Sequence, residues 1–220
     1  MSLSERLTGL PLRENIPITL VGLGHGAIHW TDAVFYLLLP ALSTTLGLSY
    51  TETGALVSIF HFSAFGANFF SGPLVDLTGR RVMFQVLSVA VGALALMAMG
   101  LAATFLALAC LVVVLGVTSN LWHPPAISFL SNRYPKNRGY ALSIHGLGAS
   151  AGDTLAPLTA GALIAAFGWQ AAAEISALPA LAVAVVLAVG LMRYETRKAE
   201  GTAARGVGLT EYLAGIRTVI

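Results

Sequence analysis

A long apolar segment that carries ionisable side chains, at about residues 16–42, constrains this chain more than any other feature. An α-helix of roughly 20 residues, rising about 1.5 Å per residue, crosses the ~30 Å hydrocarbon core of a bilayer. At 100° per residue, His25, His29 and Asp32 lie on one face of such a helix. A charged side chain at the bilayer centre costs about 2.5–3.5 kcal/mol on insertion scales, so this face must meet protein or water rather than lipid.

The composition indicates an integral membrane protein. Of the 220 residues, 56% are hydrophobic and only 10% are charged, and the mean hydropathy is +0.80; soluble domains carry about 25% charged residues. The first apolar segment is too long for a signal-peptide core and lacks a small-residue cleavage pattern behind it, so we expect it to be retained. The lone Cys110 lies within an apolar segment, where we expect a packing role.

The apolar runs and their breaks predict an all-α polytopic membrane protein with six transmembrane helices, arranged as two three-helix repeats. The predicted spans are about 16–42, 53–75, 82–103, 105–130, 140–166 and 170–192. All twelve Lys and Arg residues lie before the first span, in alternate connections, or after the last span. The positive-inside rule therefore places both termini in the cytoplasm and the protein in the inner (plasma) membrane. This assigns 1–15 to a cytoplasmic N-terminus, 16–192 to the transmembrane domain, and 193–220 to a cytoplasmic tail or the start of an inter-half linker.

All five histidines and two aspartates fall inside the predicted spans, where solubility does not explain them. They are His25, His29, His61, His123, His145, Asp32 and Asp153. Histidine and desolvated aspartate can both exchange protons near neutral pH, as a proton relay requires. We predict that Asp32 and His29 form a proton-coupling pair and that Asp153 shares the role. The alternative is that these residues form structural hydrogen bonds.

The fourth predicted span is interrupted at Trp122-His123-Pro124-Pro125, and the first carries several glycines beside its histidines. Interrupted spans at corresponding positions of two repeats point to a transporter binding site, because freed backbone groups can meet a substrate there. The substrate-binding residues that we predict are His25, Asn120, Trp122 and His123. Hydrogen bonds to neighbouring carbonyls are the alternative for the histidines, and contact with lipid is the alternative for Trp122.

Several other polar and aromatic residues of the spans are expected to be structural. We interpret His61 and His145 as structural histidines, Asn68 as a source of interhelical hydrogen bonds, and Trp169 as an interfacial anchor. Asn120 also fits an interhelical hydrogen bond. Gly148, Gly152 and Ala156 lie four residues apart, and this spacing favours close backbone approach between helices in lipid.

The connection between the second and third spans reads Gly72-Pro73-Leu74-Val75-Asp76-Leu77-Thr78-Gly79-Arg80-Arg81. It resembles the signature loop of the major facilitator superfamily, although Leu77 replaces the usual Arg. The resemblance implies that the matching residues form a charged cytoplasmic latch that gates the two halves of a transporter. The matching residues are Gly72, Asp76, Gly79, Arg80 and Arg81. The alternative is a positive-inside loop with a glycine turn.

Further motifs resemble the fosmidomycin-resistance branch of that superfamily. They are His29-Trp30-Thr31-Asp32, the segment 121–126 leading to Arg138-Gly139, and the Gly- and Pro-rich segment 146–161, which is similar to helix 5 of drug/proton antiporters. This resemblance covers about residues 16–192. It implies proton-coupled export of a small molecule. We expect this export to proceed by alternating access and without a cofactor.

Only half of the usual twelve-helix architecture is present in these residues. Residues 209–220 read as a short amphipathic helix that would lead into a second six-helix half. The chain is therefore interpreted either as a truncated transporter, which we favour, or as a half-transporter that forms a homodimer. The expected partners are a small-molecule substrate, protons, lipid and the second half, without nucleic acid.

Two other classes of function stay open from the residues. His25 and His29 are spaced i, i+4 and Asp32 completes three possible ligands, which is compatible with a membrane-embedded metalloenzyme. The five histidines, however, are scattered at different depths, so we expect neither a metal nor an enzyme. A non-transporting membrane scaffold is the other alternative. The chain has no phosphate-cradling loop of the Gly-Lys-Ser/Thr type, which argues against coupling to ATP hydrolysis.

Overall fold

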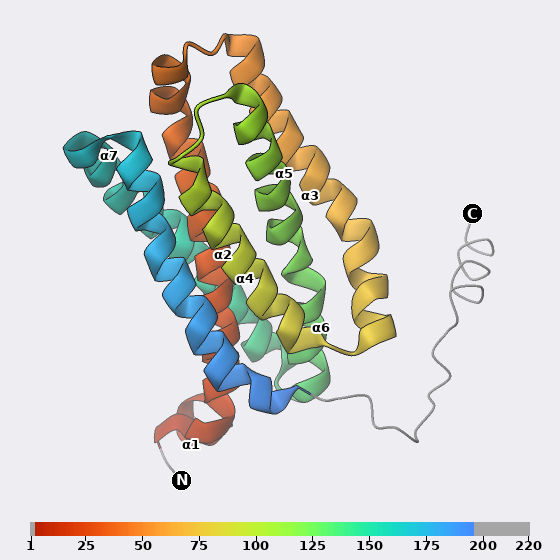
Figure 1. The fold of residues 1–220 in the computed structure, drawn as a ribbon. Helices are drawn as coiled ribbons and strands as arrows, with labels where there is room; N and C mark the ends of the chain where they lie inside the picture. The colour runs from red at the N-terminus through yellow and green to blue at the C-terminus, as the bar shows by residue number, and fades with distance from the viewer. Residues whose placement is uncertain (1–2, 196–220) are drawn as a thin grey trace.

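Residues 3–195 are described by a computed structural model, and they contain helices and no strand. The elements in chain order are α1 (Leu3–Thr8), α2 (Leu12–Leu46), α3 (Tyr50–Thr78), α4 (Arg81–Met99), α5 (Phe105–Leu121), α6 (His123–Arg133), α7 (Arg138–Leu191) and the 3-10 helix η1 (Met192–Tyr194). Figure 1 shows α3 at one edge of the bundle, α4 and α5 in the middle, and α7 at the other edge. The all-α prediction is confirmed for this part of the chain. The helix expected over 209–220 lies outside the described residues.

Four stretches within residues 3–195 are long and apolar enough to cross a membrane. They are Tyr50–Thr78, Arg81–Met99, Phe105–Arg133 and Arg138–Tyr194. The last stretch contains both predicted spans 140–166 and 170–192. Gly168 has non-helical angles, with φ of 81° and ψ of 169°, and it separates two helical segments of α7. Each predicted span overlaps helical structure, and the fourth covers both α5 and α6. Helix α2 is not among the four stretches, since its polar side chains lower its mean hydropathy.

The helix ends follow local sequence signals. Gly47 ends α2 in the left-handed region, with φ of 65°, and Ser49 then begins α3 with a capping box completed by Glu52. Gly79 ends α3 with φ of 69°. The predicted third span was too long at its far end, because α4 ends at Met99 and not at 103.

Glycines bring α2 and α7 into close backbone contact. A Cβ atom added at Gly148 would collide with the carbonyl oxygen of Gly22, and one added at Gly152 would collide with that of Gly26. Helices α5 and α3 are also in close backbone contact, at Gly116, where an added Cβ would collide with the Phe60 carbonyl oxygen. The small-residue spacing in α7 therefore does what the sequence predicted: it allows two backbones to touch.

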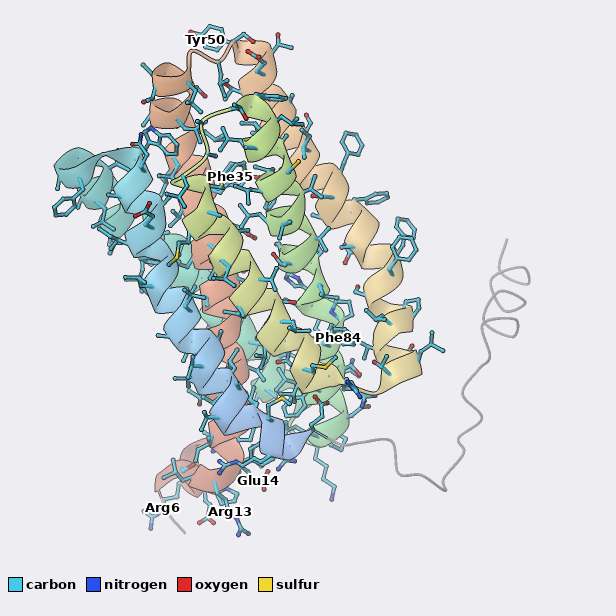
Figure 2. The ribbon with its side chains drawn as sticks, viewed as in Figure 1. Arg6, Arg13, Glu14, Phe35, Tyr50 and Phe84 are labelled. Atoms are coloured by element: carbon cyan, nitrogen blue, oxygen red, sulfur yellow. The ribbon has the colours of Figure 1, made fainter. Side chains whose placement is uncertain are left out.

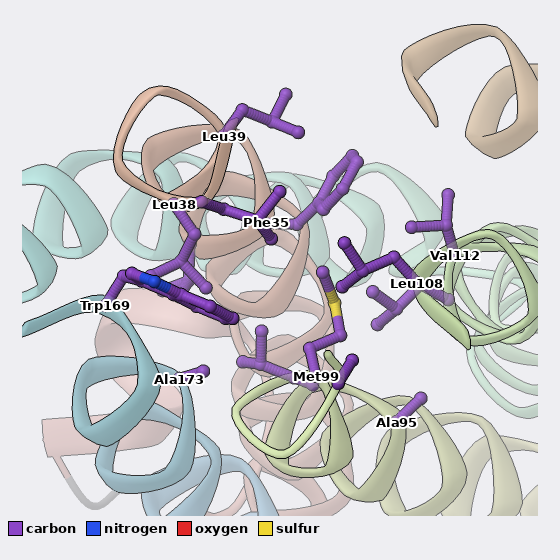
Figure 3. Close-up of a cluster of buried hydrophobic side chains, with 14 of the residues drawn as sticks. Phe35, Leu38, Leu39, Ala95, Met99, Leu108, Val112, Trp169 and Ala173 are labelled. Carbon is purple, nitrogen blue, oxygen red and sulfur yellow. The ribbon is translucent and has the colours of Figure 1, made fainter. Parts of the chain in front are cut away.

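A cluster of buried apolar side chains fills one end of the bundle (Figure 3). It includes Phe35, Leu38, Met99, Leu108 and Trp169. Trp169 has an exposed fraction of only 4%, so the prediction of an interfacial anchor was wrong. The bend at Gly168, one residue earlier, turns the chain at this point and directs the indole into the core.

The opposite end of the bundle holds the polar contacts between connections. Arg133 forms an ion pair with Glu14 at 3.1 Å, and Tyr134 donates a hydrogen bond to the Glu14 carbonyl at 2.8 Å. Burial raises the pKa of Tyr134, which keeps this donor protonated. Figure 2 shows Arg6, Arg13 and Glu14 at this end and Tyr50 at the other. The start of the described chain and the end of α7 therefore lie at the same end (Figure 1).

The glycine contact predicts an asymmetry between two neighbouring positions of α7. We expect Gly148→Ala to lower stability by about 1–3 kcal/mol, because the added methyl overpacks against the Gly22 backbone. Gly146→Ala is the matched control, since a Cβ at Gly146 meets open space. Thermal unfolding in detergent, followed by circular dichroism, measures both. Equal melting temperatures for the two variants would contradict the assigned contact.

Candidate functional site

Four of the five histidines gather between α2, α6 and α7. The His25 ring stacks on the His145 ring, with centroids 3.7 Å apart, and its Nδ1 lies 2.8 Å from the His145 carbonyl oxygen. Its Nε2 lies 3.2 Å from Nε2 of His123. The ring of His29, one turn along α2, meets that of His25 edge to face at 4.6 Å. We call His25, His29, His123 and His145 the histidine cluster. Its first and last members are 120 positions apart in the chain.

The cluster extends through His29 to an acidic residue on α7. His29 Nδ1 lies 3.1 and 3.2 Å from the two carboxylate oxygens of Asp153. The side chains of His29 and Asp153 are 30% and 56% exposed, so the pair is open to its surroundings. The structure thus brings two of the predicted proton-coupling residues into direct contact.

Asp32, the third predicted proton-coupling residue, has a different partner. Ser119 of α5 donates a hydrogen bond from its hydroxyl to the Asp32 carboxylate at 2.7 Å. The preferred sequence pairing of Asp32 with His29 is therefore corrected: His29 pairs with Asp153, and Asp32 pairs with Ser119. Sequence spacing places His29 and Asp32 on one face of α2, but the neighbouring helices supply closer partners for both.

The break between α5 and α6 positions His123. Pro124 and Pro125 have no N–H, so two carbonyls of the preceding turn lose their usual helical donors, and α5 ends at Leu121. Helix α6 then begins at His123 with proline in its first turn. The His123 ring turns back, and its Nδ1 lies 3.0 Å from the carbonyl oxygen of Ser119. The predicted interruption therefore coincides with the histidine cluster.

Trp122 supports the cluster from within the bundle. It is fully buried, and its indole N–H donates a hydrogen bond to Nε2 of His145 at 3.3 Å. Gly24 makes room for the indole, because a Cβ there would collide with its ring. This enclosure corrects the predicted direct contact between Trp122 and a substrate: Trp122 holds His145 in place instead.

Asn120 lies apart from its predicted partners. It lines an open hollow of about 640 Å³ between α3 and α5, together with Asn68 and His61. The His61 ring nitrogen Nε2 lies 2.9 Å from the Tyr36 hydroxyl of α2. The hollow therefore carries a second group of polar side chains.

The predicted latch residues lie at the polar end of the bundle. Arg81 donates a hydrogen bond to the Ser128 hydroxyl of α6 at 2.7 Å, while Asp76 and Arg80 are exposed. A Cβ at Gly72 would meet open space, whereas Gly79 has the positive φ that ends α3. Glu195 accepts hydrogen bonds from the backbone N–H groups of Val82 and Met83, where a carboxylate suits the positive end of α4.

Two residues of the site were not predicted. His145 was interpreted as an isolated structural histidine, because nothing in its neighbourhood along the chain announces a stacking partner on α2. Ser119 was also missed, although a signal existed: it precedes His123 by four residues and so shares its helical face. Both become visible only when α2 is placed against α5 and α7.

The chain belongs to the Major Facilitator Superfamily, whose family model matches residues 21–218. It is 26% identical over 186 residues to YwoD of Bacillus subtilis (strain 168), an uncharacterized MFS-type transporter; this covers 84% of the chain and 40% of the relative. It is 26% identical over 188 residues to YfnC of the same organism, also an uncharacterized MFS-type transporter, with coverage of 82% and 44%. The chain spans less than half the length of these two relatives. The protein is thus an all-α polytopic membrane protein.

The indole hydrogen bond predicts a difference between two buried tryptophans. We expect Trp122→Phe to cost about 1–3 kcal/mol more than Trp169→Phe, because only the first leaves a buried acceptor without its donor. Within residues 3–195 the indole nitrogen of Trp169 has no hydrogen-bond partner, which makes it the matched control. Thermal unfolding of the two purified variants measures the difference. A larger loss for Trp169→Phe would contradict the role given to Trp122.

Proposed function

We propose that the protein is a secondary active transporter that exports a small molecule in exchange for protons by alternating access. The observation that carries this proposal is the pair of His29 on α2 and Asp153 on α7, two titratable side chains in direct contact and open to their surroundings. An ionisable side chain inside a membrane is energetically costly unless it is paired, and here two such side chains are paired across two helices. Membership of the superfamily supports transport as the activity.

The same contacts suggest how protonation biases the two states. An ionised Asp153 accepts from His29, and an ionised Asp32 accepts from Ser119; each contact therefore ties α2 to a different neighbouring helix. Adding a proton to either carboxylate removes its charge and weakens its contact. A ligand shifts a conformational equilibrium only through such differential interaction with the two states. Asp32, His29 and Asp153 are thus proposed as the proton-coupling residues.

The substrate is proposed to bind beside the histidine cluster, against His25 and His123. The hollow at Asn120 offers a second polar surface on the α3 side. The motifs around His29 and His123 support the drug/proton antiporter class and its fosmidomycin-resistance branch. Superfamily membership favours transport over a metalloenzyme or a scaffold. The metalloenzyme alternative also required Asp32 as a third metal ligand beside His25 and His29, but the Asp32 carboxylate accepts a hydrogen bond from Ser119 instead.

The proposed topology has six spans, both termini in the cytoplasm, and insertion in the inner (plasma) membrane. Arg6 and Arg13 support it, because they lie at the end of the bundle where the described chain begins and ends (Figure 2). Arg133 pairs with Glu14 at the same end. In this topology the segment from Gly72 to Arg81, which is the last turns of α3 and its connection to α4, is the proposed cytoplasmic latch.

We further propose that a second six-helix half completes the transporter. Asp153, His61 and Asn68 are exposed within the described bundle, and polar side chains at membrane depth require protein or water beside them. A second half related by an axis along the membrane normal would provide both. The second half can come from a second copy of this chain or from a longer chain, and native mass spectrometry distinguishes these two origins. A dimer supports a second copy, and a monomer supports a longer chain.

Proton coupling is tested by removing one titratable group. We expect Asp32→Asn to abolish the dependence of transport on a pH gradient, because the amide keeps the size of the side chain but cannot exchange a proton. Uptake of radiolabelled fosmidomycin into inverted membrane vesicles, with and without an inside-acid gradient, measures this dependence. Wild-type uptake should rise with the gradient, whereas Asp32→Asn uptake should be the same in both conditions.

The control for this experiment is Glu174→Gln, which removes the same charge from another part of α7 and should keep the response to the gradient. Circular dichroism verifies that both variants fold. Gradient-dependent uptake by Asp32→Asn would remove Asp32 from the coupling residues. If wild-type vesicles take up no fosmidomycin although native mass spectrometry shows the assembled dimer, the assignment to the fosmidomycin-resistance branch is wrong; for a monomer, the uptake assay requires the longer chain.

A further inference from the structure

We propose that His25, His29 and His123 form a binding site for a divalent transition-metal ion of the zinc class. Each residue offers one ring nitrogen, and these three nitrogens lie within 4.8 Å of one another. Imidazole nitrogen is a preferred ligand of zinc, copper and nickel ions. The residues come from α2 and α6, so a bound ion would join these two helices. The inference concerns binding and does not depend on proton coupling.

The closest pair of nitrogens already has the separation that a metal requires. Nε2 of His25 and Nε2 of His123 are 3.2 Å apart. Zinc binds histidine nitrogen at about 2.0–2.1 Å in tetrahedral geometry, which separates two ligand nitrogens by about 3.3 Å. An ion can therefore enter between these rings with little movement of either backbone.

The hydrogen bonds on the far sides of the rings determine which nitrogens are free. A carbonyl oxygen can only accept, so His25 must donate its Nδ1–H to the His145 carbonyl, at 2.8 Å. For the same reason His123 must donate its Nδ1–H to the Ser119 carbonyl, at 3.0 Å. In the neutral rings both Nε2 atoms then carry lone pairs, at a separation of 3.2 Å and with no proton between them. Two such lone pairs repel each other, and a cation bound to both nitrogens, off the line that joins them, removes this repulsion.

The third histidine is oriented in the same way. His29 Nδ1 lies against the Asp153 carboxylate at 3.1 Å, so its N–H points to the carboxylate and leaves Nε2 as the ligand atom. Metal-binding histidines characteristically donate their other ring N–H to a carboxylate or a backbone carbonyl, which fixes both the tautomer and the ring orientation. All three residues of this group have such a partner.

The surroundings hold the rings in place. His145 stacks on His25 at a centroid distance of 3.7 Å, and Trp122 in turn donates a hydrogen bond to His145. His25 is buried, whereas His29 and His123 are half-buried, so the group is accessible from one side. Three protein ligands leave one tetrahedral position for water or for a group of a substrate.

The experiment is a Zn²⁺ titration of the purified full chain after removal of metals with EDTA, in competition with a chromophoric chelator. We expect one Zn²⁺ per chain and the intense visible absorption of tetrahedral Co²⁺ when Co²⁺ is used instead. His123→Gln should weaken Zn²⁺ binding by at least about 100-fold, because it removes one of three ligands. Asp153→Asn should weaken it by roughly 10–100-fold, because it removes only the partner of His29.

His61→Gln is the matched control, since His61 lies on α3 outside this group and should leave Zn²⁺ affinity unchanged. Circular dichroism establishes that each variant keeps its helices. Absence of stoichiometric Zn²⁺ binding by the folded wild-type chain overturns the proposal, and so does an equal loss in His61→Gln and His123→Gln. If nitrogen NMR shows a His25 or His123 ring with both nitrogens protonated and no Zn²⁺ bound, the pair holds a proton instead.

Discussion

The close contact between the α2 and α7 backbones is the constraint on which the rest of the structure depends. Gly148 and Gly152 lie against Gly22 and Gly26, and no side chain intervenes. His25 and His29 follow the same helical spacing along α2, so the contact that joins the glycines also brings these rings to α7. Without it, the His145 carbonyl and the Asp153 carboxylate would be out of hydrogen-bonding reach.

Burial in an apolar environment explains why so many polar groups of the site are paired. Each histidine of the proposed metal group has a ring nitrogen on an oxygen acceptor, and Asp32 has a hydroxyl donor. Unpaired polar groups are costly where water is excluded, so the pairing of the buried His25 ring favours folding before any function is considered. The same pairing selects one tautomer for each ring. Stability and chemical function therefore use the same contacts here.

The proline break and the glycines of α2 act together. The break at Pro124 and Pro125 ends α5 and allows His123 to point back toward α2, while Gly24 provides the space that the Trp122 ring fills. A larger residue at Gly24 would displace Trp122 and, with it, the hydrogen bond to His145. The proline break between α5 and α6 and the glycines of α2 together therefore position the side chains of the site.

The sequence by itself determined the class of the protein, the positions of its helices, the basic end of the bundle and the residue types at its centre. Those features depend on hydropathy, helical period and charge along the chain, which are local properties. Only the tertiary structure decided the partners: His29 with Asp153 and not Asp32, His145 beneath His25, and Trp169 in the core and not at the interface. The physical reason is that a partner depends on which helix faces which, and that is set by glycine contacts and bends between segments far apart in the chain.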